Sequence, residues 1–404
     1  MPRHSFRHCF GCALVGLLML LMWPLPGLGA AGAPQSATVA PGVAQPAPAA
    51  TLAEYRRKLE EYTAARRRYE GEADAYWNSV AEKRRIRNAK RRADKDILLE
   101  DYVLAQPPVY AGPPKPIDPS AAVENEPPPP RAYVPVVADF LQSAAKHFAF
   151  APRQPQSELD YKRSYAAVAA AAGITREQAV RIYGFESGGN GKYDVQAGLE
   201  HSGPGAHAIT TALGYNQLLA TNSLELLAEK GDAFLRALKA MAAALSGEAR
   251  TALEHKIAVL KSMVDFSRSV PDEWNQHDRL ANTPKGLGVH AMNLDLDVGP
   301  LLQVQKLRDS VVFARAKGYG APLSAAELEM MNLTGDGNGI DMVLLPAPWR
   351  DRVPTANFFQ PGGYQRNPVA IRNNVVAKLL AATDARMDEE AKLQGAKDLA
   401  ALWR

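Results

Sequence analysis

Apolar residues in the larger, C-terminal part of the chain recur every three to four positions, the spacing that places them on one face of a helix. Alternation of apolar and polar residues, the pattern of half-buried strands, is scarce. The spacing predicts a mainly α domain over residues 131–404, with a small β element near 192–200. The segments with the strongest helical pattern are 134–148, 161–172, 175–185, 223–245, 248–268, 301–317, 324–333 and 374–402.

A second helical pattern covers residues 51–105, where charged residues surround an apolar stripe with the spacing of a heptad repeat. Arg66 interrupts the stripe, which ends after Val80 because Lys83 and Arg87 occupy its next positions. The pattern predicts a long charged helix, ahead of the α domain, that packs one face against a partner. That partner is the same chain folded back, a second copy, or another envelope component. The stripe consists of Leu52, Tyr55, Leu59, Tyr62, Tyr69, Ala73, Tyr76 and Val80.

Two segments of biased composition separate these parts. Residues 34–50 are mostly alanine, proline and valine without charge, so we predict a flexible linker over 32–50. Residues 106–130 are rich in proline and end in four consecutive prolines, which predicts an extended, semi-rigid second linker. The α domain therefore begins at residue 131.

The first 31 residues have the order expected of a secretory signal peptide. A basic start precedes an apolar run over 9–23, and small residues follow, with cleavage expected after Ala31. A retained N-terminal anchor is the alternative, and either form places the protein in the periplasm or cell envelope. Both cysteines, Cys9 and Cys12, lie in this segment, so the mature chain has no thiol for disulfides, catalysis or metal binding.

The charge balance is mildly basic, since 47 Lys and Arg against 43 Asp and Glu give a net charge of +4. This charge suits contact with an anionic wall polymer and is too weak to indicate nucleic acid as a partner. The basic clusters within 51–105 offer a second interpretation of the predicted helix, as an electrostatic tether to the cell wall.

Three polar clusters do not predict a metal or cofactor site. Residues 336–341 resemble a calcium loop, but the sixth position is not glycine and no glutamate stands at the twelfth, so a helix-terminating turn is expected. His201 and His207 lack the helical spacing of zinc hydrolases. Asp295 and Asp297 alternate with leucines, which predicts an exposed loop or short strand.

Glu186 lies on the apolar face of a predicted helix. Thr175 is an expected N-cap with Gln178 in the capping-box position, and two glycines end the helix after Ser187. Ile182 and Tyr183 precede Glu186 by one turn and share its face. Burial among apolar side chains raises the pKa of a carboxyl group and keeps it protonated, as a general acid requires. A partly buried glutamate with a structural role only is the alternative.

Two motifs surround this position: Phe-Glu-Ser-Gly-Gly-Asn at 185–190 and Ala-Leu-Gly-Tyr-Asn-Gln-Leu-Leu at 212–219. Together they resemble the lysozyme-like superfamily, in particular the peptidoglycan lytic transglycosylases, over residues 160–225. The resemblance implies a lysozyme-like catalytic domain in which Glu186 is the only catalytic carboxyl group and no cofactor is needed. The residues that it assigns to substrate binding are Ser187, Tyr215 and Gln217, with Tyr364 in a later aromatic segment.

The loop between the motifs is most similar to that of lambda-type phage endolysins, because Tyr-Asp-Val at 193–195 and Ser202 lie in a longer connection. The sequence departs from that pattern at Asn216, where an aromatic residue is usual, and residues 223–354 have no counterpart. The resemblance implies cleavage of the β-1,4 bond between N-acetylmuramic acid and N-acetylglucosamine in peptidoglycan strands, with formation of 1,6-anhydro ends.

Two other functions remain open from the sequence. A hydrolytic lysozyme would use a second carboxyl group, for which Asp194 and Glu200 are the nearest candidates. A non-catalytic peptidoglycan-binding scaffold of the cell envelope would keep the fold and need no acid on the apolar face of a helix.

Overall fold

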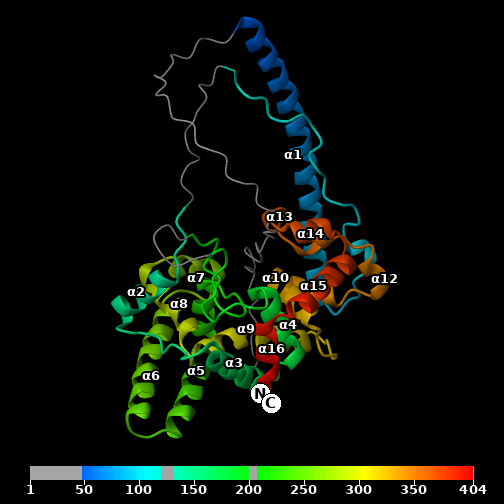
Figure 1. The fold of residues 1–404 in the computed structure, drawn as a ribbon. Coiled ribbons are helices and arrows are strands. Elements are labelled where there is room, and N and C mark those ends of the chain that lie inside the picture. The colour runs from blue at the N-terminus through cyan, green and yellow to red at the C-terminus, as the bar shows by residue number, and fades with distance from the viewer. Residues whose placement is uncertain (1–47, 120–131, 200–206, 404) are drawn as a thin grey trace. The chain divides into compact units, whose positions relative to one another are not determined.

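The computed structural model describes residues 48–119, 132–199 and 207–403. The elements of these residues are almost all helical (Figure 1), which confirms the predicted mainly α fold. They form two compact units, divided in the sequence between Ala132 and Tyr133. None of the described helices is both long and apolar enough to cross a membrane. The predicted signal peptide and nearly all of the first linker lie outside the described residues.

The N-terminal unit is built on one long helix, α1 (Ala49–Arg92). The helix ends at Arg92 rather than near residue 105, because Asp94 adopts a left-handed conformation with a φ of 51°. This turn allows the Lys95 amide to donate to the Lys90 carbonyl at 2.9 Å, which closes the helix end. The chain then forms the short 3-10 helix η1 (Leu99–Asp101) and returns along α1.

The returning segment covers the apolar stripe of α1. The ring of Tyr110 packs edge-on against Tyr69 at 5.5 Å and Tyr62 at 6.3 Å between centroids. Arg87 is fully buried, donates to a backbone carbonyl of η1 at 2.9 Å and lies 4.3 Å from the centroid of the Tyr102 ring. In the described unit, the same chain folded back therefore contacts the stripe from Tyr62 to Tyr76, and it satisfies the cation in the seam.

Replacing Arg87 by alanine should loosen the returning segment, because it removes a buried hydrogen bond and a cation–π contact, each contributing roughly 1–2 kcal/mol. We expect amide exchange in η1 to become about 10- to 100-fold faster. Arg85, whose side chain is 73% exposed, supplies the control, since Arg85→Ala should leave this exchange unchanged. Slow exchange in both variants would show that Arg87 does not hold the segment.

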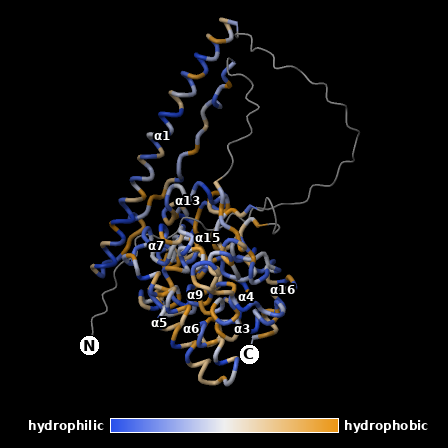
Figure 2. The backbone as a smooth tube through the Cα atoms, turned by 90° about the vertical axis from the view of Figure 1, so that its left-hand side faces the viewer, coloured by the Kyte–Doolittle hydropathy of each residue, from blue (hydrophilic) through white to orange (hydrophobic). Residues whose placement is uncertain are grey.

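The C-terminal unit contains two hydrophobic cores, and hydrophobic positions are concentrated in this unit, whereas α1 is mostly hydrophilic (Figure 2). Helix α9 (Gly299–Ala316) belongs to both cores, because its Leu302 lies in the first and its Leu307 in the second. Around the first core lie α2 (Val137–Phe148), α5 (Ala220–Ala243), α6 (Gly247–Ser267), α7 (Trp274–Ala281), α8 (Pro284–His290) and η2 (Ala291–Leu294). Around the second lie α3 (Glu158–Ala171), α4 (Arg176–Ser187), α10 (Ala325–Thr334), α11 (Asp336–Val343), α15 (Val376–Glu390) and α16 (Gln394–Ala401).

The long helices match the predicted segments, whereas short ones were not expected. The predicted helix over 374–402 is interrupted and forms α15 and α16, and residues 336–343 form α11 instead of a turn alone. Three of the four short elements before α15 have a proline in their first turn, where its missing N–H is tolerated. These four elements are α12 (Ala347–Arg350), η3 (Thr355–Phe358), α13 (Pro361–Gln365) and α14 (Pro368–Arg372).

The predicted small β element near residues 192–200 is limited to single bridges in the described chain. Gln196 pairs with Leu213 in an isolated antiparallel bridge, and the Gly214 amide donates to the Val195 carbonyl at 2.9 Å. These contacts tie the motif at 212–219 to the loop that follows α4.

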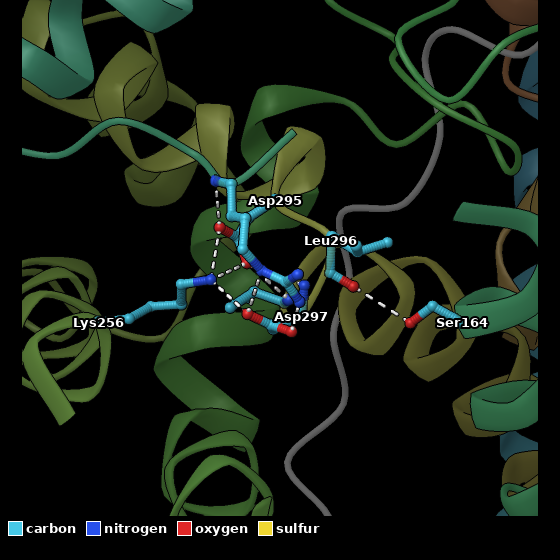
Figure 3. A network of polar contacts seen from close by, with 7 residues as sticks. Ser164, Lys256, Asp295, Leu296 and Asp297 are labelled. Atoms are coloured by element: carbon cyan, nitrogen blue, oxygen red, sulfur yellow. Dashed lines mark hydrogen bonds and ion pairs between the residues drawn. The ribbon is translucent and has the colours of Figure 1, made fainter. Parts of the chain in front are cut away.

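A buried ion network fixes the chain in front of α9 (Figure 3). Lys256 of α6 donates to Asp295 at 2.8 Å and to Asp297 at 2.5 Å, and Arg153 also pairs with Asp297. Asp295 is fully buried, so the prediction of an exposed loop for these two aspartates is wrong. The alternation with leucine did not reveal their burial, because the cation that neutralises them comes from a different helix.

Candidate active site

Glu186 lies near the C-terminal end of α4, on its buried face, with 6% of its surface exposed. The helix begins with the predicted capping box. The Gln178 amide donates to the Thr175 hydroxyl at 3.1 Å, and the Thr175 amide donates to the Gln178 side chain at 2.9 Å. The helix ends where Gly188 adopts a left-handed conformation with a φ of 66°. Local sequence therefore sets both ends of the helix that carries Glu186.

The turn that follows α4 is held by the two C-terminal helices. Gly189 has a φ of 69°, and a Cβ atom there would lie 2.5 Å from the Glu390 carbonyl oxygen, so the position requires glycine. The Ala396 amide donates to the Gly189 carbonyl at 2.9 Å, and the Gly395 amide donates to the Asn190 side chain at 3.0 Å. The Ser-Gly-Gly-Asn sequence is thus fixed by the end of the chain.

Two side chains of α10 contact the Glu186 carboxyl group. Asn332 Nδ2 donates to Glu186 Oε1 at 2.9 Å. The carboxyl group of Glu329, which is 1% exposed, is in hydrogen-bonding contact with that of Glu186. Arg386 of α15 brings a positive charge close to both carboxyl groups. The site therefore combines side chains from three helices that are far apart in the sequence.

Burial raises the pKa of Glu186 to about 7. The hydrogen bond with Glu329, the charge of Arg386 and the amide of Asn332 oppose this rise. Burial also raises the pKa of Glu329 well above its usual range, and the neighbouring Glu186 raises it further. Because two carboxyl groups in contact resist a second negative charge, they titrate as a coupled pair. Glu186 can therefore exchange a proton near neutral pH.

The raised pKa predicts how stability depends on pH. The folded pKa of Glu186, about 7, lies above the ordinary value of 4.5, so its contribution is full below pH 4.5 and is lost as the pH rises through 7. Glu186→Gln stays neutral and should gain stability relative to the parent, by about 3 kcal/mol at pH 8 and by little at pH 4. Denaturant unfolding at both pH values measures this difference, and an equal difference at the two would contradict it.

Ser187 and Tyr215, which the resemblance assigns to substrate binding, are both buried. Ser187 Oγ donates to the Tyr183 carbonyl one turn earlier at 2.5 Å. The Tyr215 hydroxyl donates to Glu158, and its ring makes edge contacts with three other tyrosines at 4.6 to 5.2 Å between centroids. Placed in this way, Tyr215 is a core residue whose ring has no face open to a sugar, which does not fit the role in substrate binding that the resemblance implies.

The motif at 212–219 is joined to α9 through Gln303. The Asn216 amide donates to the Gln303 side chain at 2.8 Å, and the Asn216 side chain donates to the Gln303 carbonyl at 2.8 Å. Gly214 has a φ of 83°, and a Cβ atom there would lie 2.6 Å from Gln303 Nε2. An aromatic residue at position 216 would keep the bond from its backbone amide but lose the side-chain bond to the Gln303 carbonyl and the one that Asn216 Oδ1 accepts from Tyr165, so the departure from the endolysin pattern fits the pairing with α9.

Gln217 lies between this motif and the loop after α4. Its Nε2 donates to the Gly214 carbonyl at 2.7 Å and to the Val195 carbonyl at 3.1 Å. Its Oε1 is buried and has no hydrogen-bond donor within the described chain. This oxygen has almost no accessible surface, so it is not open to a ligand in this arrangement.

Tyr364 lies in α13, among the short helices between α11 and α15. It is buried, and its ring lies 6.0 Å from that of Phe359 between centroids. Burial raises its pKa, and a hydrogen bond with Thr355 partly opposes the rise. Its assignment to substrate binding stays a prediction.

The carboxyl group that contacts Glu186 is Glu329, which the sequence did not single out. The sequence had offered Asp194 and Glu200 as candidates for this role. The charge of Asp194 raises the pKa of Tyr193, and Glu200 lies outside the described residues. A signal for Glu329 exists, because the residue stands in the run Leu328-Glu329-Met330-Met331, whose other members are all apolar. A charged residue in such a helix is rarely buried without a polar partner.

The comparisons with known proteins give no match, neither to a family model nor to a curated protein nor to a solved structure. Over residues 48–119, 132–199 and 207–403, no group of three or more His, Cys, Asp or Glu side chains is placed to hold a metal ion. The functional assignment therefore depends on the geometry around Glu186.

Proposed function

We propose that this protein is a peptidoglycan lytic transglycosylase of the periplasm or cell envelope, with Glu186 as its catalytic acid. The observation that carries the proposal is the burial of Glu186, which raises the pKa of its carboxyl group to about 7. Such a group is partly protonated at neutral pH and can protonate a glycosidic oxygen. Its place before a Ser-Gly-Gly turn, at the end of a capped helix, supports the resemblance to the lysozyme-like superfamily.

The proposed reaction uses one carboxyl group twice. Glu186 protonates the oxygen that joins N-acetylmuramic acid to N-acetylglucosamine, and the bond from C1 to this oxygen breaks while the muramyl N-acetyl group stabilises C1. The Glu186 carboxylate then accepts the proton of the C6 hydroxyl, whose oxygen bonds to C1. The anhydro ring closes, no water is consumed, and Glu186 is again protonated.

The contact between Glu186 and Glu329 favours this reaction over hydrolysis by two opposed carboxyl groups. The paired carboxyl groups of glycosidases stand about 5 to 9.5 Å apart, which leaves room for the sugar carbon and, in inverting enzymes, for water. Carboxyl groups in hydrogen-bonding contact leave no such space. Glu329 therefore fits neither the nucleophile nor the base of those enzymes, and a hydrolytic lysozyme would need its water activated elsewhere.

A non-catalytic peptidoglycan-binding scaffold is the second candidate. Only 6% of Glu186 is exposed, so little of its carboxyl group is open to a polymer in this arrangement. This low exposure is the observation that favours binding without cleavage.

Digestion of purified sacculi distinguishes these functions. The mature protein is incubated with sacculi, and the masses of the released muropeptides are measured, with the sedimented fraction assayed for bound protein. We expect products with 1,6-anhydro ends. Reducing ends would identify a hydrolytic lysozyme, and binding without release would identify a scaffold, so either result would reject the transglycosylase.

A further inference from the structure

We propose that Glu329 is a positioning residue that stays protonated and donates a hydrogen bond to Glu186, so that Glu186 is the member of the pair that releases and regains a proton. The purpose of this arrangement rests on the proposed function. The place of the proton does not, because it is a property of the folded protein that can be measured without a substrate.

The contact itself requires a proton. Both carboxyl groups are buried, with 6% of Glu186 and 1% of Glu329 exposed, and they face each other across the packing of α4 against α10. Ionised carboxyl groups only accept hydrogen bonds, so two of them bond to each other only when one is protonated. If both carboxyl groups were ionised, two negative charges would be buried away from water and would repel each other, which is unfavourable. One carboxyl group therefore remains a carboxylic acid at neutral pH.

The neighbouring donors indicate which carboxyl group carries this proton. Asn332 lowers the pKa of both carboxyl groups, but its hydrogen bond of 2.9 Å runs from Nδ2 to Glu186 Oε1, which favours a negative charge on Glu186. Glu329 Oε2 has no donor in the described part of the chain, so a carboxylate at Glu329 would leave a buried charged oxygen unsatisfied. A carboxylic acid at Glu329 instead uses its own proton in the bond to Glu186. Burial raises the pKa of both carboxyl groups, which agrees with a proton held on the pair at neutral pH.

The other charged groups nearby do not provide a second counter-charge. Of those on the packed helices, Arg386 is the one whose charge lowers the pKa of both carboxyl groups, and it lies 3.8 Å from Glu390. A single cation that already has an acidic neighbour stabilises one negative charge better than two. The remaining charged side chains on these helices are Arg176, Glu177 and Arg181 of α4, Glu327 of α10, Lys378, Asp384, Asp388 and Glu389 of α15, Lys397 and Asp398 of α16, Glu158, Asp160, Lys162 and Arg163 of α3, Lys306, Arg308, Asp309 and Arg315 of α9, and Asp336 and Asp341 of α11.

A protonated Glu329 has two consequences for Glu186. Its hydrogen bond fixes the orientation of the Glu186 carboxyl group, and it becomes stronger when Glu186 turns into a carboxylate after giving up its proton. It also lowers the pKa of Glu186 from the higher value that burial alone would produce. Proton release and proton return are thereby kept close in free energy, as a reaction that uses one carboxyl group twice requires.

Infrared spectroscopy of the mature protein tests the place of the proton, because the C=O stretch of a carboxylic acid is separate from the bands of a carboxylate. At pH 8.5 we expect the spectrum of the parent minus that of Glu329→Gln to contain a protonated carboxyl group. The parent minus Glu186→Gln should contain a carboxylate, as should the control, Glu177→Gln on the exposed start of α4. A protonated group that disappears with Glu186, or none in either difference, would overturn the proposal.

The pH dependence of sacculus digestion is the second readout, and it uses two replacements of Glu329. Glutamine keeps a donor toward Glu186 and should keep the midpoint of the alkaline limb close to that of the parent. Methionine fills a similar volume without a donor, so the midpoint should move upward by about 1 pH unit. Equal midpoints in the methionine variant and the parent would overturn the positioning role. Spectra that place the proton on Glu329 in a protein that releases no muropeptides would support the proton assignment and reject the proposed function.

Discussion

Replacing Glu186 by glutamine should lower the release of muropeptides from sacculi by about 10²- to 10⁴-fold, the usual contribution of a general acid. Glutamine has the shape of glutamate, and its carbonyl oxygen can still accept the bond from Asn332, but it has no acidic proton. The loss should therefore fall on the rate of cleavage and leave binding to sacculi intact. Mass spectrometry of the soluble products measures the first, and sedimentation with sacculi measures the second.

Glu177→Gln is a matched control for this experiment, because Glu177 lies in the exposed first turn of the same helix. It should release muropeptides at the parent rate, and circular dichroism should show the same helix content in all three proteins. Release at the parent rate by Glu186→Gln would assign the acid to a different residue.

Replacing Lys256 by methionine should lower the free energy of unfolding by about 3–5 kcal/mol, the usual effect of removing one partner from a buried ion pair. The change leaves Asp295, which is fully buried, and Asp297 as neighbouring negative charges without their shared cation. The remaining side-chain partner, Arg153, pairs with Asp297 at a position where the arginine is 58% exposed. Urea denaturation at pH 7, followed by circular dichroism, measures the loss.

Lys261→Met is the control on the same helix. Lys261 pairs with Asp265 at the surface, with 65% and 60% of the two side chains exposed, so its removal should change stability by less than about 0.5 kcal/mol. Equal losses in the two variants would mean that the network around Lys256 contributes no more than a surface ion pair.

The features of the site that depend on neighbouring residues could be predicted from the sequence. Thr175 and Gln178 form the expected capping box, and Gly188 ends the helix after Glu186, because a few adjacent residues determine helix ends. The spacing of Ile182 and Tyr183 placed Glu186 on the buried face for the same reason. The long helices followed from periodicity, whereas the short helices before α15 contain too few turns to show one.

The features that depend on contacts between distant segments could not be predicted. Asn332 and Glu186 bond to each other across 146 positions of sequence, and no local pattern pairs them. The stripe on α1 showed that a face had to be covered, yet the cover is an extended segment with no periodicity of its own. The alternation around Asp295 suggested exposure because the pattern contains no sign of Lys256, which neutralises it.

The surroundings that raise the pKa of Glu186 come from helices that leave the ribosome at different times. α4 comes first, α10 brings Glu329 and Asn332 later, and α15 adds Arg386 close to the C-terminus. A chain that stops before α10 contains the Glu-Ser-Gly-Gly sequence without the burial that raises the pKa of Glu186, so its carboxyl group would be ionised at neutral pH. Under the proposed function, incomplete or proteolysed copies would then be inactive, and lytic activity would begin only when the fold is complete.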